Sequence, residues 1–206
     1  MNVTVIGPGA IGSVVATIAA KAGAQVQVLA RDPQDSAAVA DRIGATAGRV
    51  GDTITGDLVV LAVPFAALVD LVGTYRSQLE GKVVVETTNP VDMDTFDGLV
   101  VPADSSATAE LQAALPGARV VKAFNTNFAA TLNTTRTGAA PTTVLVAGDD
   151  DSARQTVIDL VTSAGLAAQS AGSLKRAREL EAIGFLQMTL AAGESISWNG
   201  GFALHQ

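Results

Sequence analysis

The chain has 206 residues, enough for one sizeable domain with its own core. Its 20 acidic and 13 basic side chains give a net charge of −7, which argues against a nucleic-acid or anionic-membrane surface. Because cysteine is absent, disulfides, thiolate metal sites and cysteine nucleophiles are excluded. No signal pattern or membrane-length apolar run is visible, so we expect a cytoplasmic protein without a membrane partner.

Short β-branched runs alternate with helical patterns along the chain. This alternation predicts βαβ units, and hence a Rossmann-like, doubly wound, mostly parallel sheet with helices on both faces. We expect helices near 10–22, 35–43, 65–80, 104–115 and 150–164. The expected strands are Val3–Ile6, Val26–Leu29, Leu58–Val63, Val83–Val85, Val120–Phe124 and Thr143–Val146.

Polar residues at two boundaries are expected to cap helices. Asp35-Ser36 is expected to begin the second helix. The three acids Asp149, Asp150 and Asp151 precede a later helix, where they suit the positive end of its dipole. We therefore expect caps here, and no metal site.

The segment from Leu174 to Ala192 begins charged and becomes apolar on nearly every side from Ile183 onward. A helix that is apolar all round must be buried, yet little chain remains to cover it. We therefore expect a C-terminal interface helix, covered partly by a second subunit in a homodimer. The expected organisation is a dinucleotide-binding domain over 1–172, followed by a helix and tail over 173–206 that complete the substrate cleft.

The first strand leads directly into a glycine cluster that opens a helix. In this context the cluster predicts a dinucleotide pyrophosphate site. Gly7 permits a tight turn, Gly9 lets the backbone approach the phosphates, and Gly12 lets the helix pack close to the strand. Free N–H groups at the helix start would then face the phosphates. The expected ligands are Gly7, Pro8, Gly9, Ala10, Ile11 and Gly12.

The tip of the second strand bears on the choice between NAD and NADP. An NAD site usually has an acid here for the ribose hydroxyls, whereas this chain has Ala30 and Arg31. A guanidinium suits a 2′-phosphate, so we favour NADP(H) as the cofactor. Two alternatives stay open: Asp32, one residue later, could be a ribose ligand, or Arg31 could be a solvated strand end.

Ligands of open α/β sheets bind at the carboxyl edge, so later strand ends should also meet the cofactor. The candidates are Ala62, Val63, Pro64, Asn89, Ala123 and Asn125. Asn89 and Asn125 could bond the nicotinamide carboxamide. A turn asparagine bonding its own backbone is an equally good interpretation of each.

Seven segments resemble one family, the coenzyme F420-dependent NADP oxidoreductases, in which F420 is a deazaflavin. They are VIGPGAIG, LARD, DLVVLAVPF, GKVVVETTNPV, VVKAFNTNFAATL, VAGDDDSA and RELEAIGFLQMTLA, and they span at least 1–192. The chain also resembles, more distantly, a cytosolic metalloreductase domain that is attached to membrane haem proteins.

The resemblance implies hydride transfer between NADP and a flavin-like ring. It also implies that the loop residues hold the pyrophosphate and that Ala30 and Arg31 hold the 2′-phosphate. Val63 and Pro64 would flank the adenosine-side ribose or the pyrophosphate. The deazaflavin-specific enzymes have a histidine in the segment matching Phe124-Asn125-Thr126, where this chain has Asn125. The resemblance therefore supports the NADP site and leaves the acceptor open.

No residue stands out as a general acid, and we name no catalytic residue. The sole histidine, His205, is interpreted as a tail residue, and Lys122 as a snorkelling or a hydrogen-bonded structural lysine within a strand. A flavin-type acceptor needs no protein acid, so we expect an NADPH-dependent oxidoreductase with a deazaflavin, flavin or related redox acceptor. Trp198 and Phe202 could stack on such a ring or serve as core or interface aromatics. The alternatives are a non-catalytic NADP(H) sensor and a dimeric imine or carbonyl reductase.

Overall fold

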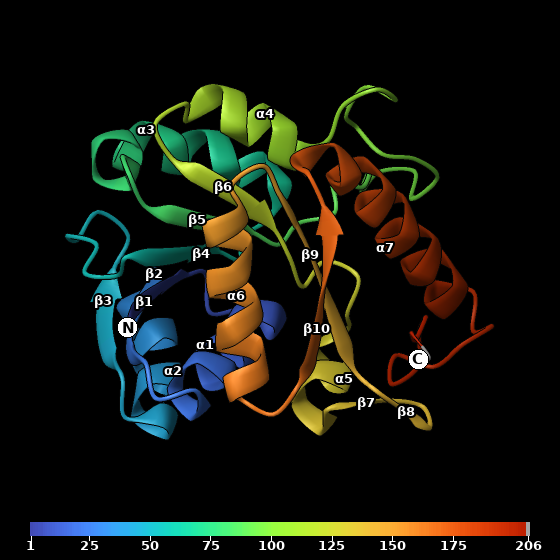
Figure 1. Cartoon of the computed structure of the whole chain (residues 1–206), viewed down its shortest axis with the longest axis horizontal. Helices are drawn as coiled ribbons and strands as arrows, with labels where there is room; N and C mark the ends of the chain where they lie inside the picture. The colour runs from blue at the N-terminus through green and yellow to red at the C-terminus, as the bar shows by residue number, and fades with distance from the viewer. Residues whose placement is uncertain (205–206) are drawn as a thin grey trace.

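A single eight-stranded sheet forms the centre of the computed structural model, which describes residues 1–204 (Figure 1). Its strands are β1 (Asn2–Ile6), β2 (Gln25–Ala30), β3 (Thr46–Arg49), β4 (Leu58–Leu61), β5 (Val83–Glu86), β6 (Arg119–Lys122), β9 (Thr143–Gly148) and β10 (Ala167–Gly172). A short antiparallel hairpin, β7 (Arg136–Thr137) with β8 (Ala140–Pro141), lies outside the sheet.

The strand order is β10-β9-β6-β5-β4-β1-β2-β3. All pairings are parallel except β6 with β9, which confirms the expected mostly parallel sheet. The chain moves outward from β1 in one direction through β2 and β3, and in the other through β4, β5 and β6. The loop after β1 therefore lies at the point where the strand order reverses, which is where such sheets bind ligands.

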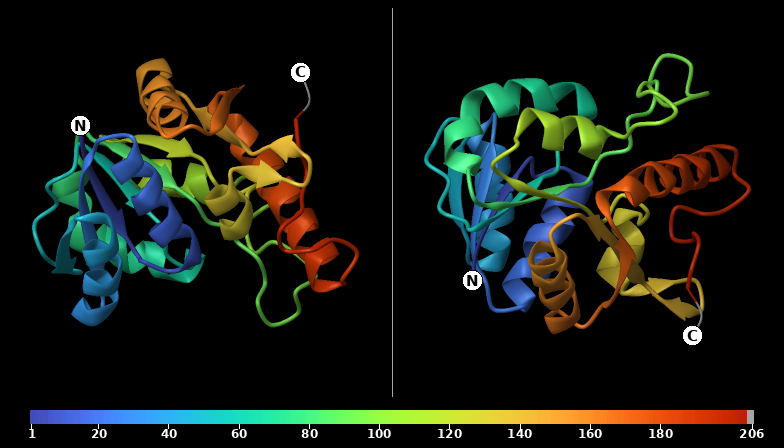
Figure 2. Two further views of the ribbon diagram at one scale, coloured as in Figure 1. Left: turned by 90° about the horizontal axis from the view of Figure 1, so that it is seen from below. Right: turned by 45° about the horizontal axis from the view of Figure 1, so that its top comes forward.

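Helices cover both faces of the sheet, and the alternating side chains of the strands fill two apolar cores. Val3 and Val5 of β1 face the core beneath α1, α2 and α6, whereas Ile6 joins the core beneath α3 and α4. Figure 2 shows these layers from two further directions. The helices are α1 (Ala10–Lys21), α2 (Pro33–Ile43), α3 (Leu68–Leu79), α4 (Ala107–Ala114), α5 (Ala129–Thr134), α6 (Asp151–Ser163) and α7 (Ala177–Ala192), with 3-10 turns at Phe65–Ala67 and Leu174–Arg176.

The cap expected at Asp35-Ser36 is wrong. Helix α2 begins earlier, with Asp32 as its N-cap and Pro33 in its first turn, and the Asp32 carboxylate accepts a hydrogen bond from the Gln34 N–H. Proline suits this first position because it has no N–H to leave unpaired. Of the acids before α6, Asp150 is the N-cap as expected and accepts from the Ala153 N–H, whereas Asp149 does not cap α6 and accepts instead from the distant Leu174 N–H.

Helix α7 is only partly covered by the rest of the chain, and the expected cover by a second subunit stays a prediction. Its polar residues Glu181 and Gln187 are buried within the chain, whereas Ile183 and Leu186 are exposed. The helix crosses the open flank of the sheet beside β9 and β10 (Figure 1). The last strand, β10, ends at Gly172, and a 3-10 turn, α7 and the tail follow it. The two-part division itself stays a prediction.

Among residues 1–204, no helix has the length and apolarity needed to cross a bilayer. Within the same range, no group of histidine and acidic side chains is arranged to hold a metal ion. The interpretation of His205 concerns a residue outside those that the structure describes.

Candidate cofactor and acceptor site

The glycine cluster forms a tight turn between β1 and α1. Gly7 has a φ of +94°, and a Cβ on it would lie 2.4 Å from the Ala62 carbonyl oxygen. A Cβ on Gly12 would lie 1.9 Å from the Gly7 carbonyl oxygen, so only glycine allows α1 to pack this closely. Gly9 has open space where its Cβ would be, and its position at the start of α1 has no side-chain cap. The free N–H groups of α1 therefore face a region that an anion can approach.

A cavity of about 790 Å³ lies on one side of this turn; we call it the Arg31 pocket. It brings together the loop, the tip of β2 and the segment after β4, three regions that are far apart in the sequence. Of the predicted site residues, it is lined by Gly7, Pro8, Gly9, Ala30, Arg31, Ala62, Val63 and Pro64.

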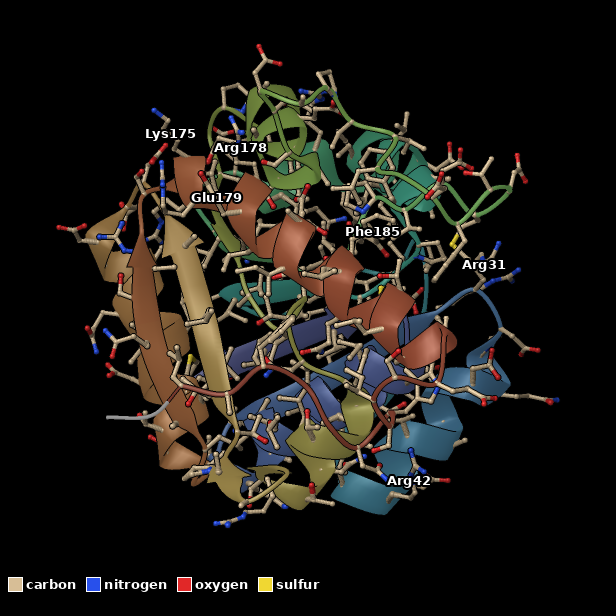
Figure 3. All side chains as sticks on the ribbon, turned by 90° about the vertical axis from the view of Figure 1, so that its right-hand side faces the viewer. Arg31, Arg42, Lys175, Arg178, Glu179 and Phe185 are labelled. Carbon is tan, nitrogen blue, oxygen red and sulfur yellow. The ribbon has the colours of Figure 1, made fainter. Side chains whose placement is uncertain are left out.

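Arg31 is exposed at the mouth of this pocket, and Asp35 and Asp70 also line it. The Asp32 carboxylate is engaged in capping α2 and does not line the pocket, which favours Arg31 over Asp32 as the residue that contacts the ribose end. Figure 3 shows Arg31 well separated from Lys175, in the 3-10 turn before α7, and from Arg178 in the first turn of α7. Among the described residues that line the Arg31 pocket, Arg31 is the one basic side chain.

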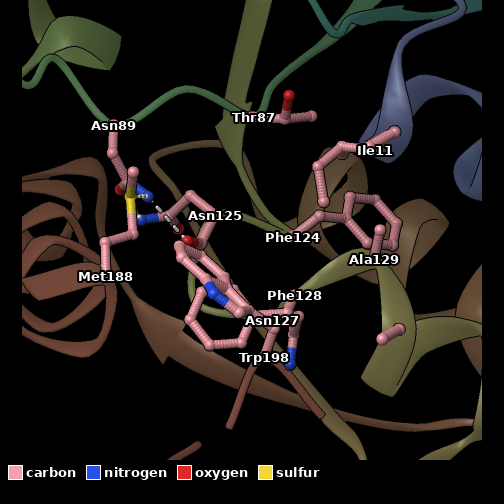
Figure 4. Close-up of a pocket in the computed structure, with 12 residues that line it drawn as sticks. Ile11, Thr87, Asn89, Phe124, Asn125, Asn127, Phe128, Ala129, Met188 and Trp198 are labelled. Carbon is pink, nitrogen blue, oxygen red and sulfur yellow. Dashed lines mark hydrogen bonds between the residues drawn. The ribbon is translucent and has the colours of Figure 1, made fainter. Parts of the chain in front are cut away.

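A second cavity, of about 410 Å³, lies on the other side of the turn; we call it the Trp198 pocket (Figure 4). Ala10 and Ile11 of α1 line it, so consecutive residues of one loop border both cavities. The remaining lining residues come from the ends of β5 and β6, from α5 and α7, and from the tail: Thr87, Asn89, Phe124, Asn125, Asn127, Phe128, Ala129, Ala130, Met188 and Trp198.

Amide groups supply much of the polar lining of the Trp198 pocket. Asn89 and Asn125, at the ends of neighbouring strands, hydrogen-bond to each other, and Asn125 Nδ2 also donates to the Leu180 carbonyl of α7. The neighbouring Phe124 has a φ of +66°, an unusual conformation for a bulky residue. Such strain persists only where the surrounding structure holds it, and here Phe124 is fully buried beside the pocket.

The opposite wall of the pocket is aromatic. The Trp198 and Phe128 rings lie 4.8 Å apart between centroids and are tilted by 54°. Trp198 is about half exposed, so part of its ring remains free for a ligand. In the part of the chain that the structure describes, none of the lining side chains is ionisable. The pocket is therefore suited to a flat, largely apolar ring with polar edges.

Beneath this pocket lies Lys122, whose interpretation as a structural lysine agrees with its complete burial. Its ammonium group donates to Glu86 at 2.6 Å, to Glu181 at 2.8 Å and to the Thr88 carbonyl. Burial raises the pKa of Glu181, and the Lys122 ammonium opposes part of that shift.

Comparison with known proteins gives matches along the whole chain. The family model described as coenzyme F420-dependent NADP oxidoreductase matches residues 2–90. The F420-dependent NADP reductase of Methanothermobacter thermautotrophicus is 30% identical, over 89% of this chain and 86% of that protein. The chain belongs to the coenzyme F420-dependent NADP oxidoreductase family. NADP(H), the cofactor favoured from the sequence, is therefore the cofactor of its family.

The match to a second family member is less extensive. The F420-dependent NADP reductase of Methanocaldococcus jannaschii is 31% identical over 62% of this chain, and the match spans only 59% of that protein. A solved structure from Arthrobacter sp. FB24, assigned provisionally to the same reductases, has a TM-score of 0.86 and covers 99% of each chain. At 24% identity, that likeness shows the Rossmann-like fold.

In the present chain, the predicted site residues form three groups according to the cavity that they line. Eight line the Arg31 pocket, and Ala10, Ile11, Asn89 and Asn125 line the Trp198 pocket. Gly12 packs beneath the loop without lining either cavity. Ala123 is fully buried in the core and also lines neither, because the chain turns into the pocket only at Phe124.

Reasoning from the sequence missed part of the Trp198 pocket and the partners of Lys122. Phe128, Ala129 and Met188 were not expected at the site, and Glu181 was not expected beside a residue 59 positions away. The signal available in the sequence was a charged residue within a largely apolar helix. Such a residue, once buried, normally has a partner of opposite charge.

Proposed function

We propose that the chain transfers hydride between NADP(H) and a flat, flavin-type ring that binds in the Trp198 pocket. The observation that carries this proposal is the pair of cavities on either side of one glycine turn. One has a basic side chain at the tip of β2, and the other is aromatic and amide-lined with no ionisable group among the described residues.

The residues present fit the cofactor. Gly7, Gly9 and the free N–H groups at the start of α1 would hold the pyrophosphate, and Arg31 would hold the 2′-phosphate. Ala62 to Pro64 would flank the adenosine side, and Asn89 and Asn125 stand where the nicotinamide end would lie. When bound, NADPH supplies a hydride, which is two electrons and one proton.

The acceptor has to gain that hydride without help from an ionisable side chain of the Trp198 pocket. The pocket walls orient the ring and exclude water, and the Trp198–Phe128 pair offers a stacking surface. Reduction of a flavin-type ring is completed by one proton, which solvent can supply. Reduction of a carbonyl or imine gains more from a positioned acid, so a flavin-type ring is the better match.

An acceptor screen tests this proposal. NADPH oxidation is measured with a deazaflavin, FMN, ferric chelates, carbonyls and imines, and we expect turnover with a flavin-type ring. Replacement of Trp198 by Ala is expected to raise the acceptor KM about tenfold, whereas Trp198→Phe retains most of the activity. NADPH binding without oxidation by any acceptor would favour a non-catalytic NADP(H) sensor. Turnover with imines or carbonyls alone would favour a dimeric imine or carbonyl reductase.

We infer also that the outer face of α7 contacts a second copy of the chain. Ile183, Leu186, Phe202 and Leu204 are between 37% and 52% exposed and border one apolar hollow of about 230 Å³. Apolar surface of this kind is typical of an interface between subunits. Sedimentation should give a dimer for the wild type and a monomer for Leu186→Glu. Val69→Glu, at an exposed position of α3, should leave the dimer intact. A monomeric wild type at micromolar concentration would contradict the inference.

A further inference from the structure

Three charged side chains form a fully buried group that the proposed chemistry does not use. We call Glu86, Lys122 and Glu181 the charge cluster. The side chains of all three have no exposed surface. The Lys122 ammonium has three donors and three acceptors, namely one oxygen of each carboxylate and the Thr88 carbonyl. Every N–H of the buried cation is therefore paired.

The first role of the charge cluster is to hold the segment that follows β5. That strand ends at Glu86, so Thr88 has no strand neighbour for its backbone groups. The Thr88 N–H donates to the Glu86 carboxylate, and the Thr88 carbonyl accepts from Lys122. The residues on either side, Thr87 and Asn89, both line the Trp198 pocket. The charge cluster thus replaces the sheet as the support for this edge of the pocket.

The second role concerns α7. Glu181 Oε1 accepts from Lys122, and its Oε2 accepts from the Ala107 N–H in the first turn of α4, at 3.1 Å. One turn after Glu181, Gly184 lies against Asn89 and Asn125, and one turn later Met188 lines the pocket. The ion pair at Glu181 therefore sets the position of α7 along the pocket.

Stability alone does not account for the charge cluster. Two carboxylates surround one ammonium, and taking charges out of water costs free energy that their attraction repays only partly. Apolar side chains of similar size often give equal or greater stability in such places. What they cannot provide is a hydrogen bond to each backbone group of Thr88.

We propose that Glu86, Lys122 and Glu181 are positioning residues that fix the Thr87–Asn89 edge of the Trp198 pocket and the placement of α7 against it. This inference rests on the proposed function, because it assigns the Trp198 pocket to the nicotinamide and the acceptor. It predicts that loss of Glu181 impairs the nicotinamide end of the site and leaves the Arg31 pocket unchanged.

The decisive comparison is Glu181→Leu with Glu181→Gln. Removal of this carboxylate leaves Glu86 and Lys122 as a neutral pair, so Glu181→Leu strands no charge and should fold. We expect its kcat to fall at least tenfold, while Glu181→Gln, which keeps an oxygen for Lys122, stays within about threefold of wild type. Glu110→Leu makes the same change at an exposed position of α4 and should have no effect. Equal kcat values for the folded Leu and Gln variants would overturn the inference.

A binding measurement keeps this test separate from the proposed reaction. Affinity is measured for NADPH and for 2′-phospho-ADP-ribose, a fragment that lacks the nicotinamide. For Glu181→Leu we expect weaker NADPH binding, by at least fivefold, with unchanged fragment binding. If the wild type oxidises no NADPH with any acceptor, the proposed function fails, and this pair of affinities still decides the inference. Equal losses for both ligands, or no loss for either, would overturn it.

If Glu181→Leu does not fold, the triple variant Glu86→Leu/Lys122→Met/Glu181→Leu replaces the whole charge cluster with apolar side chains. We expect this variant to fold, to bind the fragment as the wild type does and to lose at least tenfold in kcat. Wild-type kcat and NADPH affinity in the triple variant would show that the charge cluster only fills space. Failure of both variants to fold would overturn the inference in favour of a structural role.

Discussion

Asn89 and Asn125 hydrogen-bond to each other in both directions across the ends of β5 and β6. Asn89 Nδ2 donates to the Asn125 backbone carbonyl at 2.9 Å, and Asn125 Nδ2 donates to Asn89 Oδ1 at 2.8 Å. Gly184 of α7 closes over this pair, because a Cβ there would lie 2.6 Å from Asn89 Oδ1 and 2.8 Å from the Asn125 carbonyl oxygen. The absence of a side chain at Gly184 is what lets α7 seal this side of the Trp198 pocket.

We therefore expect Gly184→Ala to separate the two asparagines or to lift α7. Since both outcomes misplace the nicotinamide end, steady-state kinetics should show at least a tenfold loss in kcat/KM for the acceptor. Gly193→Ala, at the C-terminal end of the same helix, meets only the Thr189 carbonyl at 3.3 Å and serves as the control. Similar kinetics for the two variants would contradict this account of Gly184.

The two glycines that flank the start of α1 should differ in what they control. Gly12→Ala forces a Cβ against the Gly7 carbonyl oxygen, so thermal unfolding should show a marked loss of Tm without any ligand. Gly9→Ala has free space and an ordinary φ of −68°, so its Tm should stay near that of the wild type. Because the added methyl group stands where the backbone meets the phosphates, NADPH affinity measured by calorimetry should still fall at least tenfold. Unchanged NADPH affinity in Gly9→Ala would show that the phosphates do not bind at this loop.

Replacement of Arg31 separates the two nicotinamide cofactors. A charge-assisted hydrogen bond contributes about 1.5–3 kcal/mol, so Arg31→Ala should weaken NADPH binding by roughly tenfold to a hundredfold. NADH lacks the 2′-phosphate, and its affinity should change little. Arg42→Ala, which removes an exposed arginine from the last turn of α2, is the matched control. Equal losses for NADPH and NADH in Arg31→Ala would exclude contact with the 2′-phosphate.

The raised pKa of Glu181 predicts how stability depends on pH. Desolvation by burial is the main cause, and the folded state therefore holds a proton that the unfolded chain releases above its ordinary pKa of 4.5. This contribution to stability is fully present below that value and is lost as the pH rises through the higher folded pKa. Glu181→Gln cannot ionise, so urea unfolding should show the wild type losing stability relative to this variant as the pH rises from about 5. If the free energy of unfolding changed with pH in the same way for both proteins, the raised pKa of Glu181 would be contradicted.

Those parts of the fold whose signal lies in consecutive residues could be predicted from the sequence. The strands β1, β2, β4, β5, β6 and β9 each contain two or more buried β-branched or leucine residues, so each stands out in the sequence. Strand β3 has the sequence TAGR and is mostly exposed, and β10 has the sequence AAQSAG. Neither has an apolar run, because an edge strand or a half-covered strand buries little. Helix α5 has six residues, too few for a periodic pattern.

The candidate site likewise has a part that local sequence predicts and a part that it does not. The glycine turn and Arg31 are local features, and the structure places them around one cavity. The other cavity depends on contacts between distant parts of the chain, such as Trp198 with Phe128 and Asn125 with Leu180. In helix α7 the apolar composition gave no sign that the polar side chains of Glu181 and Gln187 are buried within the chain. Partners for buried polar groups had to be sought across the whole chain.

The uncharged lining of the Trp198 pocket has a kinetic consequence. If the proposed hydride transfer takes place there, the described lining residues offer no ionisable side chain that could deliver a proton in the same step. Deuterium at C4 of the reduced nicotinamide should therefore slow single turnovers, whereas exchanging the solvent for heavy water should leave their rate nearly unchanged. A large solvent isotope effect would instead indicate a proton donor outside that lining.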